Sequence, residues 1–484
     1  MRKSFIAIAI GATLMTGALA GCSTQDTKAA NVTAVQTQNP LFQASTLQYQ
    51  APDFSVIKDE HFQPALEQGI KEQYQEILAI ANNPAAPTFD NTIVAMEKSG
   101  ALLNRASSVF YNLAGSNSNP ALRKIQGEMA PKMAAHSDNI NLNPALFARI
   151  EAIYNDRNNL GLTPEAVRLV EVYHQRFIMA GAKLTDEQKV KIRALNEEQS
   201  TLTNEFSQRL LRLTKEIAIV VDNKEQLAGL SDSEITSAAN DAKAAGHEGK
   251  YLINITNTTR QPILASLENR ELRQRIWEAS ANRGLTGENE TASLVSRLAQ
   301  LRAERAALLG YENWASYRLA PQMAKTPEAV YSMFGSMVPA VVANTEKDAA
   351  DIQAMINKTG GKFELAPWDW EFYAEKVRQE KYALDANSIR PYFEFNRVLE
   401  DGVFYTLKEL YGVTLKPRPD LPVYHPDVKA YEMFDADGSS MAIFYADYFA
   451  REGKRGGAWM SSFVGQSFLE GTKPVVVNVM NIKK

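Results

Sequence analysis

The sequence contains a single cysteine, Cys22, among its 484 residues. An internal disulfide, a cysteine nucleophile in the body of the chain and a thiolate metal site are therefore excluded. Basic residues are not in excess either, because the formal net charge is −4 and the pI is near 5.9. A chain with this charge has no basic field to attract nucleic acid, which excludes nucleic acid as an expected partner.

Long apolar runs are scarce, and the only one of note is Phe5 to Ala20. It is shorter than the roughly 20 residues of a lasting membrane helix, and a second run of that length is lacking. Arg2 and Lys3 precede the run, and Leu19-Ala20-Gly21-Cys22 ends it. This arrangement resembles the lipobox of bacterial lipoproteins, and the alternative is an ordinary cleaved signal that contains a cysteine.

The lipobox resemblance implies that residues 1–21 are a signal peptide and that Cys22 is lipidated. The protein would then be anchored to a membrane through its lipid, facing the periplasm in the bacterial cell envelope. Ser23, which is not acidic, favours the outer membrane under the sorting rule of lipoproteins. Residues 22–55, which are rich in small and polar side chains towards their start, are expected to form a flexible tether.

The remaining 400 or so residues exceed what one hydrophobic core usually serves, so we expect at least two lobes. We divide them into an N-terminal helical region, residues 56–255, and a C-terminal domain, residues 256–484. Helix starts are predicted where a capping side chain precedes proline or has capping-box spacing. These caps are Asn143, Thr163, Thr185, Ser231 and Thr326.

After Thr185, apolar residues from Ile192 to Ile217 recur on one helical face without an intervening proline. The pattern predicts one amphipathic helix of roughly nine turns. It is not a strict heptad, which favours a packing face inside a helical lobe over a coiled-coil partner.

Short strands are expected near residues 218–221 and 251–255. Beyond Gly412, β-branched and aromatic residues predict strands over 423–434, 441–449 and 475–482, with a turn at 435–438. The predicted fold is therefore mainly α-helical with a small β-sheet in the C-terminal part.

Catalytic motifs are lacking. The five histidines offer no pair at i and i+4 that could bind zinc from one helix, and glycines around His247 predict a loop. Neither a G-x-S-x-G nucleophile elbow nor a phosphate loop occurs. The residues alone thus indicate a helix-rich lipoprotein with a small sheet.

Several blocks in series nevertheless resemble the thimet-oligopeptidase-like zinc metallopeptidases, and the last two of them are most similar to the dipeptidyl-carboxypeptidase branch. The blocks run through residues 297–311, 367–373, 423–428, 446–451 and 456–460, and the similarity extends from about residue 55 to the end.

The resemblance implies a two-lobed helical scaffold with a deep channel that admits short peptides, from which this branch removes C-terminal dipeptides. It also implies one zinc ion on a helix with an H-E-x-x-H motif, whose glutamate is the base. In the family that helix follows the counterpart of Asn481 by a few tens of residues. The sequence therefore predicts an N-terminal fragment with an incomplete catalytic lobe, without zinc ligands or a catalytic base, and inactive by itself.

The candidate substrate-binding residues are Gly457, Ala458 and Trp459. In peptidases of this general type an edge strand pairs with the extended substrate, glycine permits close approach, and a tryptophan can form the wall of a pocket. The alternative places Trp459 in the core. The basic turn 453–456 is expected either to lie near the substrate's carboxylate or to be solvated.

His425 is expected to be a positional residue on a strand, hydrogen-bonded locally, and to be a ligand or proton donor only as an alternative. We expect packing between lobes for Trp368, Trp370, Phe372 and Tyr373, and contact with the substrate is the alternative.

Other functions stay open: a non-catalytic peptide-binding lipoprotein, a structural helical lipoprotein, or a chain completed by a downstream polypeptide with the zinc helix. A fragment would leave the apolar faces of strands such as 475–482 uncovered, which predicts poor solubility.

Overall fold

A computed structural model describes residues 39–383 and 386–482 of the chain. Contacts divide the chain into two units, residues 1–39 and 40–484, and all elements below belong to the second. The predicted signal peptide, the lipidation site Cys22 and the tether up to residue 38 lie outside the described residues. Within the described part, no helix has both the length and the apolar character needed to cross a membrane.

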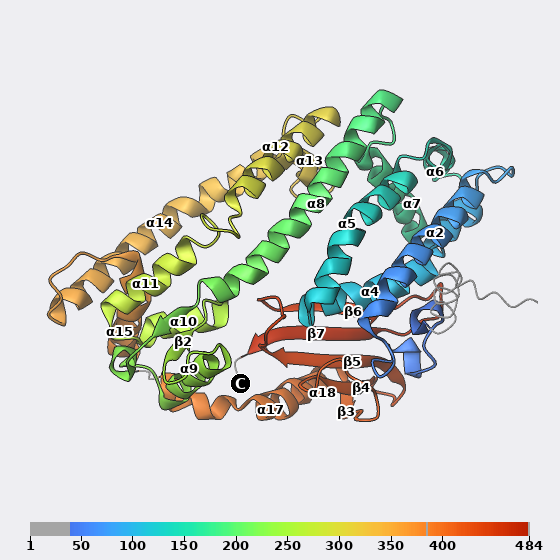
Figure 1. Ribbon diagram of the computed structural model, residues 1–484. Helices are drawn as coiled ribbons and strands as arrows, with labels where there is room; N and C mark the ends of the chain where they lie inside the picture. The colour runs from blue at the N-terminus through green and yellow to red at the C-terminus, as the bar shows by residue number, and fades with distance from the viewer. Residues whose placement is uncertain (1–38, 384–385, 483–484) are drawn as a thin grey trace, which may run out of the picture. The chain divides into compact units, whose positions relative to one another are not determined.

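Helices make up most of the described chain (Figure 1), which confirms the predicted fold class. The longer ones are α2 (Phe62–Ala81), α4 (Ala101–Ser116), α5 (Pro120–Asn141), α6 (Pro144–Asp156), α7 (Pro164–Ala180), α8 (Asp186–Glu216), α9 (Asp232–Ala244), α10 (Asn257–Ser266), α11 (Arg270–Ala281), α12 (Ala292–Leu308), α14 (Pro327–Lys358) and α15 (Trp370–Tyr382). Shorter ones are α3 (Ala95–Glu97), α13 (Trp314–Leu319), α16 (Ala386–Ile389), α17 (Phe395–Arg397) and α18 (Tyr405–Tyr411).

The strands form two sheets. The small one pairs β1 (Ile219–Val221) with β2 (Tyr251–Ile253), which lie where the two short strands were predicted. The larger one has the order β3-β4-β5-β7-β6, in which β5 and β7 are parallel and the other pairs are antiparallel. Its strands are β3 (Thr414–Pro417), β4 (Lys429–Phe434), β5 (Ser440–Phe449), β6 (Trp459–Val464) and β7 (Val475–Ile482).

The predicted helix starts are confirmed at the atomic level. The side chains of Asn143, Thr163 and Thr326 each accept a hydrogen bond from the backbone N–H three residues on, and proline follows each of them. Thr185 and Ser231 form the predicted capping boxes. Helix α8 begins after Thr185 and runs for 31 residues, close to the expected length. It packs against α5 and α12, which confirms a packing face within a helical body.

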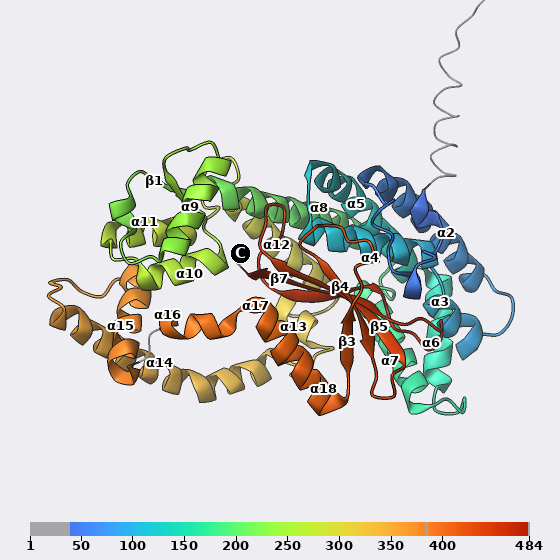
Figure 2. The same cartoon turned by 90° about the horizontal axis from the view of Figure 1, so that it is seen from below.

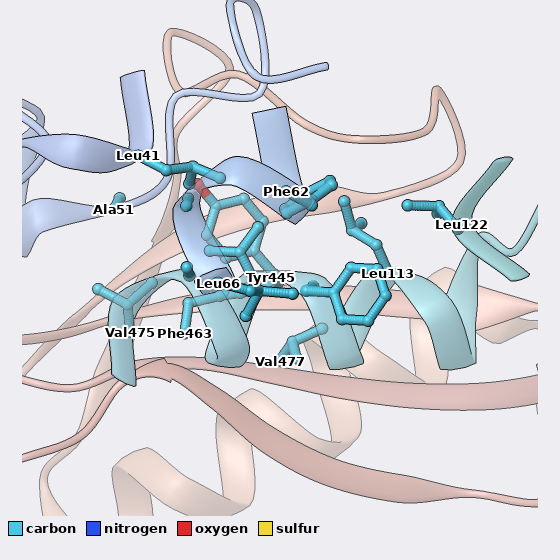
Figure 3. Close-up of a cluster of buried hydrophobic side chains, with 14 of the residues drawn as sticks. Leu41, Ala51, Phe62, Leu66, Leu113, Leu122, Tyr445, Phe463, Val475 and Val477 are labelled. Carbon is cyan, nitrogen blue, oxygen red and sulfur yellow. The ribbon is translucent and has the colours of Figure 1, made fainter. Parts of the chain in front are cut away.

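The main hydrophobic cluster joins the first helices to one face of the larger sheet (Figure 3). Side chains of α2, α4 and α5 pack there against Tyr445, Phe463, Val475 and Val477. On the other face, α17 and the π-helical segment Val398–Phe404 supply aromatic rings that pack on β4 and β5 (Figures 1 and 2). Hydrophobic contacts therefore cross the boundary predicted between residues 255 and 256.

The tether prediction is wrong for residues 40–55. Leu41 and Ala51 are buried in the main cluster, and Phe54 packs edge-to-face on Tyr424, Tyr445 and Phe463. The prediction failed because the stretch is polar on average, although a few of its residues are apolar and pack on the sheet.

Two strand predictions also need correction. Residues 423–428 form bends and turns instead of the start of a strand, because the ladder with β5 begins only at Lys429. Strand β7 is not uncovered, since it lies between β5 and β6 and its Val475, Val477 and Val479 are at most 1% exposed. Exposed apolar side chains gather instead on the first half of α14.

Candidate functional site

The predicted substrate-binding residues lie where the chain enters β6, the last strand in the order of the larger sheet. Trp459 is the first residue of β6, and Gly457 and Ala458 precede it as exposed residues. The expectation of an edge strand at this point is therefore confirmed in geometry. The carbonyl of Ser462 accepts a 3.2 Å hydrogen bond from Asn112 of α4, so part of the strand's hydrogen-bonding capacity is already used.

Gly457 has φ +99°, a conformation that favours glycine, and the space around the position of a side chain is open. Its carbonyl accepts a 2.6 Å hydrogen bond from Nδ2 of Asn481 in β7. Another backbone could therefore approach this position closely, as the sequence predicts.

Trp459 lies partly in the core, and its role as the wall of a substrate pocket stays a prediction. One part of the ring packs against the main hydrophobic cluster next to Gly115 of α4. The guanidinium of Arg455 lies 4.6 Å from the centroid of the ring. Trp459 is therefore half-buried, with a cation held against its indole.

The basic turn is not solvated as a whole, and this is a correction. Lys454 is buried, and its ammonium donates to Oδ1 of Asp447 at 2.8 Å, to the carbonyl of Asp447 at 2.9 Å and to that of Phe449 at 2.8 Å. All three donors are thus used inside the protein. Arg455 alone of these two cations is exposed, and the two expectations for the turn stay open for it.

Asp447, on β5, is the centre of this buried cluster. Its carboxylate also accepts hydrogen bonds from Tyr424 at 2.7 Å and from both terminal nitrogens of Arg451 at 2.6 and 2.8 Å. Burial opposes the charge of Asp447, but the hydrogen bonds from Arg451, Lys454 and Tyr424 outweigh it and lower the pKa of the carboxyl. Burial in turn lowers the pKa of Lys454 and raises that of Tyr424.

The same cluster ties the loop between β5 and β6 to the end of α4. Arg451 donates to the carbonyl of Ser116 at 2.6 Å, and the backbone N–H of Arg455 donates to the carbonyl of Gly115 at 2.8 Å. Gly453, with φ +76°, is so close to the residues that follow α4 that a Cβ would come within 2.2 Å of the carbonyl oxygen of Ser118. The loop that leads into Gly457 and Trp459 is therefore held by the buried ion pairs of Asp447 and by hydrogen bonds to the end of α4.

A second buried carboxylate explains the aromatic block at 367–373. Asp369 is fully buried and is held by Arg273 at 2.9 Å and by Arg270 at 2.8 Å. These contacts join α11 to the start of α15. Phe372 and Tyr373 are buried against α14, and Trp368 lies edge-to-face on Trp277, so this block packs between helices.

His425 does not lie on a strand, which corrects the prediction. It lies in the turn before β4, where its Nδ1 accepts from the backbone N–H of Asp427 at 3.2 Å. The local hydrogen bond that was expected is thus present. His247 lies in a loop, as predicted.

Within residues 39–383 and 386–482, no three His, Cys, Asp or Glu side chains gather as they would around a metal ion. Among these residues we assign no zinc ligand or catalytic base.

Sequence reasoning missed the cluster of Asp447, Arg451 and Lys454. Its only signal was an acidic and a basic residue four positions apart at the end of an apolar strand. On a strand and loop that spacing has no fixed meaning, in contrast to its meaning on a helix.

Comparison with known proteins shows that the chain is similar to peptidases. The model of peptidase family M3 matches residues 263–484. The dipeptidyl carboxypeptidase of Salmonella typhimurium is 46% identical over 447 residues, which cover 92% of this chain and 66% of that protein. Its counterpart in Escherichia coli is 45% identical over 449 residues, covering 93% and 66%.

Oligopeptidase A of Salmonella typhimurium is less similar, at 28% identity over 454 residues that cover 92% of this chain and 66% of that protein. The chain thus spans 66% of the length of these curated relatives.

Proposed function

Since the chain belongs to peptidase family M3 through residues 263–484, we propose that it is part of a zinc-dependent dipeptidyl carboxypeptidase that releases C-terminal dipeptides from short peptides. The high identity to two dipeptidyl carboxypeptidases, against 28% to oligopeptidase A, favours this branch. In such an enzyme the zinc ion polarises the scissile carbonyl and activates water. The role that we propose for Gly457, Ala458 and Trp459 is to bind the peptide.

The observation that carries the proposal is the start of the edge strand β6. A main chain that lies along Trp459 can pair with backbone groups of the strand, and an exposed glycine and alanine leave room for it. Arg455 stands over Trp459 with its charge exposed, so it can attract the free carboxylate of a peptide.

Calorimetric titration of the purified chain with a six-residue peptide tests this proposal. We expect saturable binding, tighter for the free carboxylate than for the C-terminal amide. The Trp459→Ala variant should weaken binding of both forms by about tenfold, the loss expected from one aromatic contact. The Arg455→Met variant should remove only the difference between acid and amide.

Phe468→Ala is the matched control, because Phe468 is 96% exposed and lies in the loop after β6. It should bind as the unchanged chain does. Equal binding of the peptide by Trp459→Ala and by the unchanged chain would contradict the proposed binding site.

The envelope location is a separate part of the proposal. We propose that Cys22 carries the lipid, with a periplasm-facing, lipid-anchored protein as the result. Growth with a labelled fatty acid should label the unchanged chain and leave Cys22→Ser unlabelled. Label on Cys22→Ser, or a mature protein without lipid at Cys22, would contradict this.

The expected inactivity of the 484-residue polypeptide stays a prediction, and a peptidase assay with added zinc tests it. A non-catalytic peptide-binding lipoprotein is the alternative: it predicts the same binding without hydrolysis under any condition. Co-purification with a separate polypeptide that restores hydrolysis would instead support completion of the enzyme by a second chain.

A further inference from the structure

A groove of about 590 Å³, lined by both polar and apolar side chains, lies between α5 and α8, away from the buried clusters described above. The two helices pack antiparallel, since Gln208 contacts the carbonyl of Arg123 while Asn196 contacts Asp138 at the other end. The only charged residues that line the groove are Asp138 and Arg305, which have opposite signs. The other polar side chains are amides and hydroxyls, such as Gln126, Asn204 and Thr203. Such a groove suits an uncharged polar ligand.

The far end of the groove holds polar atoms with unused hydrogen-bonding capacity. Asp138 is 6% exposed and accepts a 2.7 Å hydrogen bond from Nδ2 of Asn196. Among the described residues, however, the buried Oδ1 of Asn196 and the buried Nε of Arg305 have no hydrogen-bond partner. A buried polar atom without a partner is costly, so both atoms favour a group that supplies their partners. One needs a donor and the other an acceptor, and a peptide unit offers both.

The near end of the groove leads to the edge strand. Tyr111 of α4 lines the groove, and Gly115, one helical turn further on, lies against the ring of Trp459. Figure 1 shows α4, α5 and β6 side by side at this end. Asn112, the neighbour of Tyr111, donates a hydrogen bond to the carbonyl of Ser462, so a chain that starts at Trp459 and runs along β6 reaches Tyr111 near Ser462.

The length of the groove also fits. Its lining residues on α5 run from Gln126 to Asn141, which at 1.5 Å per residue is about 22 Å. An extended peptide rises about 3.3 Å per residue, so about seven residues would fill the groove. Strand β6 accommodates about six more.

We propose that the groove between α5 and α8 is a second binding site for the main chain of the peptide, continuous with the edge strand. This inference rests on the proposed function, because it assigns the more distant part of the same substrate. The amide-lined groove holds the main chain irrespective of its side chains, and Asn196 and Arg305 bind one of its peptide units at the far end.

Binding of two uncharged, capped alanine–serine peptides, of 6 and 14 residues, tests the proposal by calorimetry on the full chain. The long peptide should bind at least about tenfold more tightly, the gain expected from two further hydrogen bonds. Asn196→Ala and Arg305→Met should remove this gain and leave the affinity of the short peptide unchanged. Glu197→Ala, at an exposed neighbour outside the groove, is the matched control and should keep the gain.

Ala134→Phe tests the same site by filling the groove, because Ala134 lines it and belongs to neither buried charge cluster. It should also abolish the gain. A long peptide that binds no better than the short one, or a gain that survives all three variants, would overturn the inference. Failure of the short peptide alone would contradict the edge strand and leave the groove supported. Failure of both peptides would contradict both sites.

Discussion

The ammonium of Lys454 lies 2.8 Å from Oδ1 of Asp447, and neither side chain is exposed to solvent. The pair holds the loop that enters the edge strand, because Lys454 also donates to two carbonyls of β5. A buried charge is stable only when it is paired and hydrogen-bonded, and here every donor of Lys454 has a partner.

Replacing Lys454 with methionine should therefore destabilise the protein strongly. The change leaves the buried Asp447 with fewer donors, and breaking such a pair costs about 3–5 kcal/mol. Urea unfolding followed by circular dichroism measures the loss. The control is Lys215→Met, because Lys215 and its partner Glu452 are 70% and 77% exposed. That variant should change the free energy of unfolding by less than about 1 kcal/mol. Equal losses in the free energy of unfolding for the two variants would show that the buried pair stabilises the fold no more than an exposed pair does.

Gly453 should tolerate alanine much less well than Gly438. Both glycines have positive φ, +76° and +82°, but only at Gly453 would a Cβ meet backbone, the Ser118 carbonyl at 2.2 Å. Both variants place a Cβ at positive φ, which costs about 1 kcal/mol, and Gly453→Ala adds about 1–3 kcal/mol of overpacking. Thermal unfolding compares the two. Peptide binding should weaken only in Gly453→Ala, since Gly438 lies in the turn between β4 and β5.

Sequence patterns were sufficient for the elements that depend on local chemistry. The cap at Thr185 and the helical repeat after it fixed the start and length of α8, because capping and periodicity act within a few residues. The edge strand at Trp459 was expected from the family resemblance and not from a local pattern.

Long-range packing could not be predicted in the same way. Leu41 and Ala51 looked like part of a polar tether, but they are buried because a sheet more than 370 residues later along the chain offers them an apolar face, as the contact of Phe54 with Tyr445 shows. Lys454 looked like a solvated cation for the same reason, since its partner Asp447 faces it only once β5 is folded. Neither partner is visible in a local pattern.

Asp138 should make the stability depend on pH in a defined direction. Burial raises its pKa above 3.8, only partly offset by Asn196, Arg193 and Arg305. The folded state therefore binds more protons than the unfolded state just above pH 3.8, and stability falls as pH rises through the raised folded pKa. Asp138→Asn removes this loss, so its melting temperature relative to the unchanged chain should rise with pH and then level off.

Asp420→Asn should affect the pH dependence of stability in the opposite direction. Hydrogen bonds from Arg418 lower the pKa of Asp420, so its carboxylate favours folding above pH 3.8 and loses that effect only as pH falls through the lower folded pKa. This variant should be less stable than the unchanged chain at neutral pH and equal to it in strong acid. Melting curves between pH 3 and 8 check both variants, and parallel pH profiles for the two would refute the assignment.

The first half of α14 should drive self-association of the purified chain. Tyr331, Phe334, Met337, Val338 and Val341 are 72%, 46%, 52%, 51% and 56% exposed, and an apolar surface of this size favours association in water. Met337→Glu combined with Val341→Lys places a favourable ion pair one turn apart at the centre of this surface. The double variant should stay monomeric at concentrations where the unchanged chain associates, with a free energy of unfolding within about 0.5 kcal/mol. Ala343→Glu, at an exposed position of α14 just past these residues, is the control and should associate as before. Sedimentation velocity over a range of concentrations decides the matter, because an unchanged chain that sediments as a monomer throughout would show that this surface does not attract a second copy.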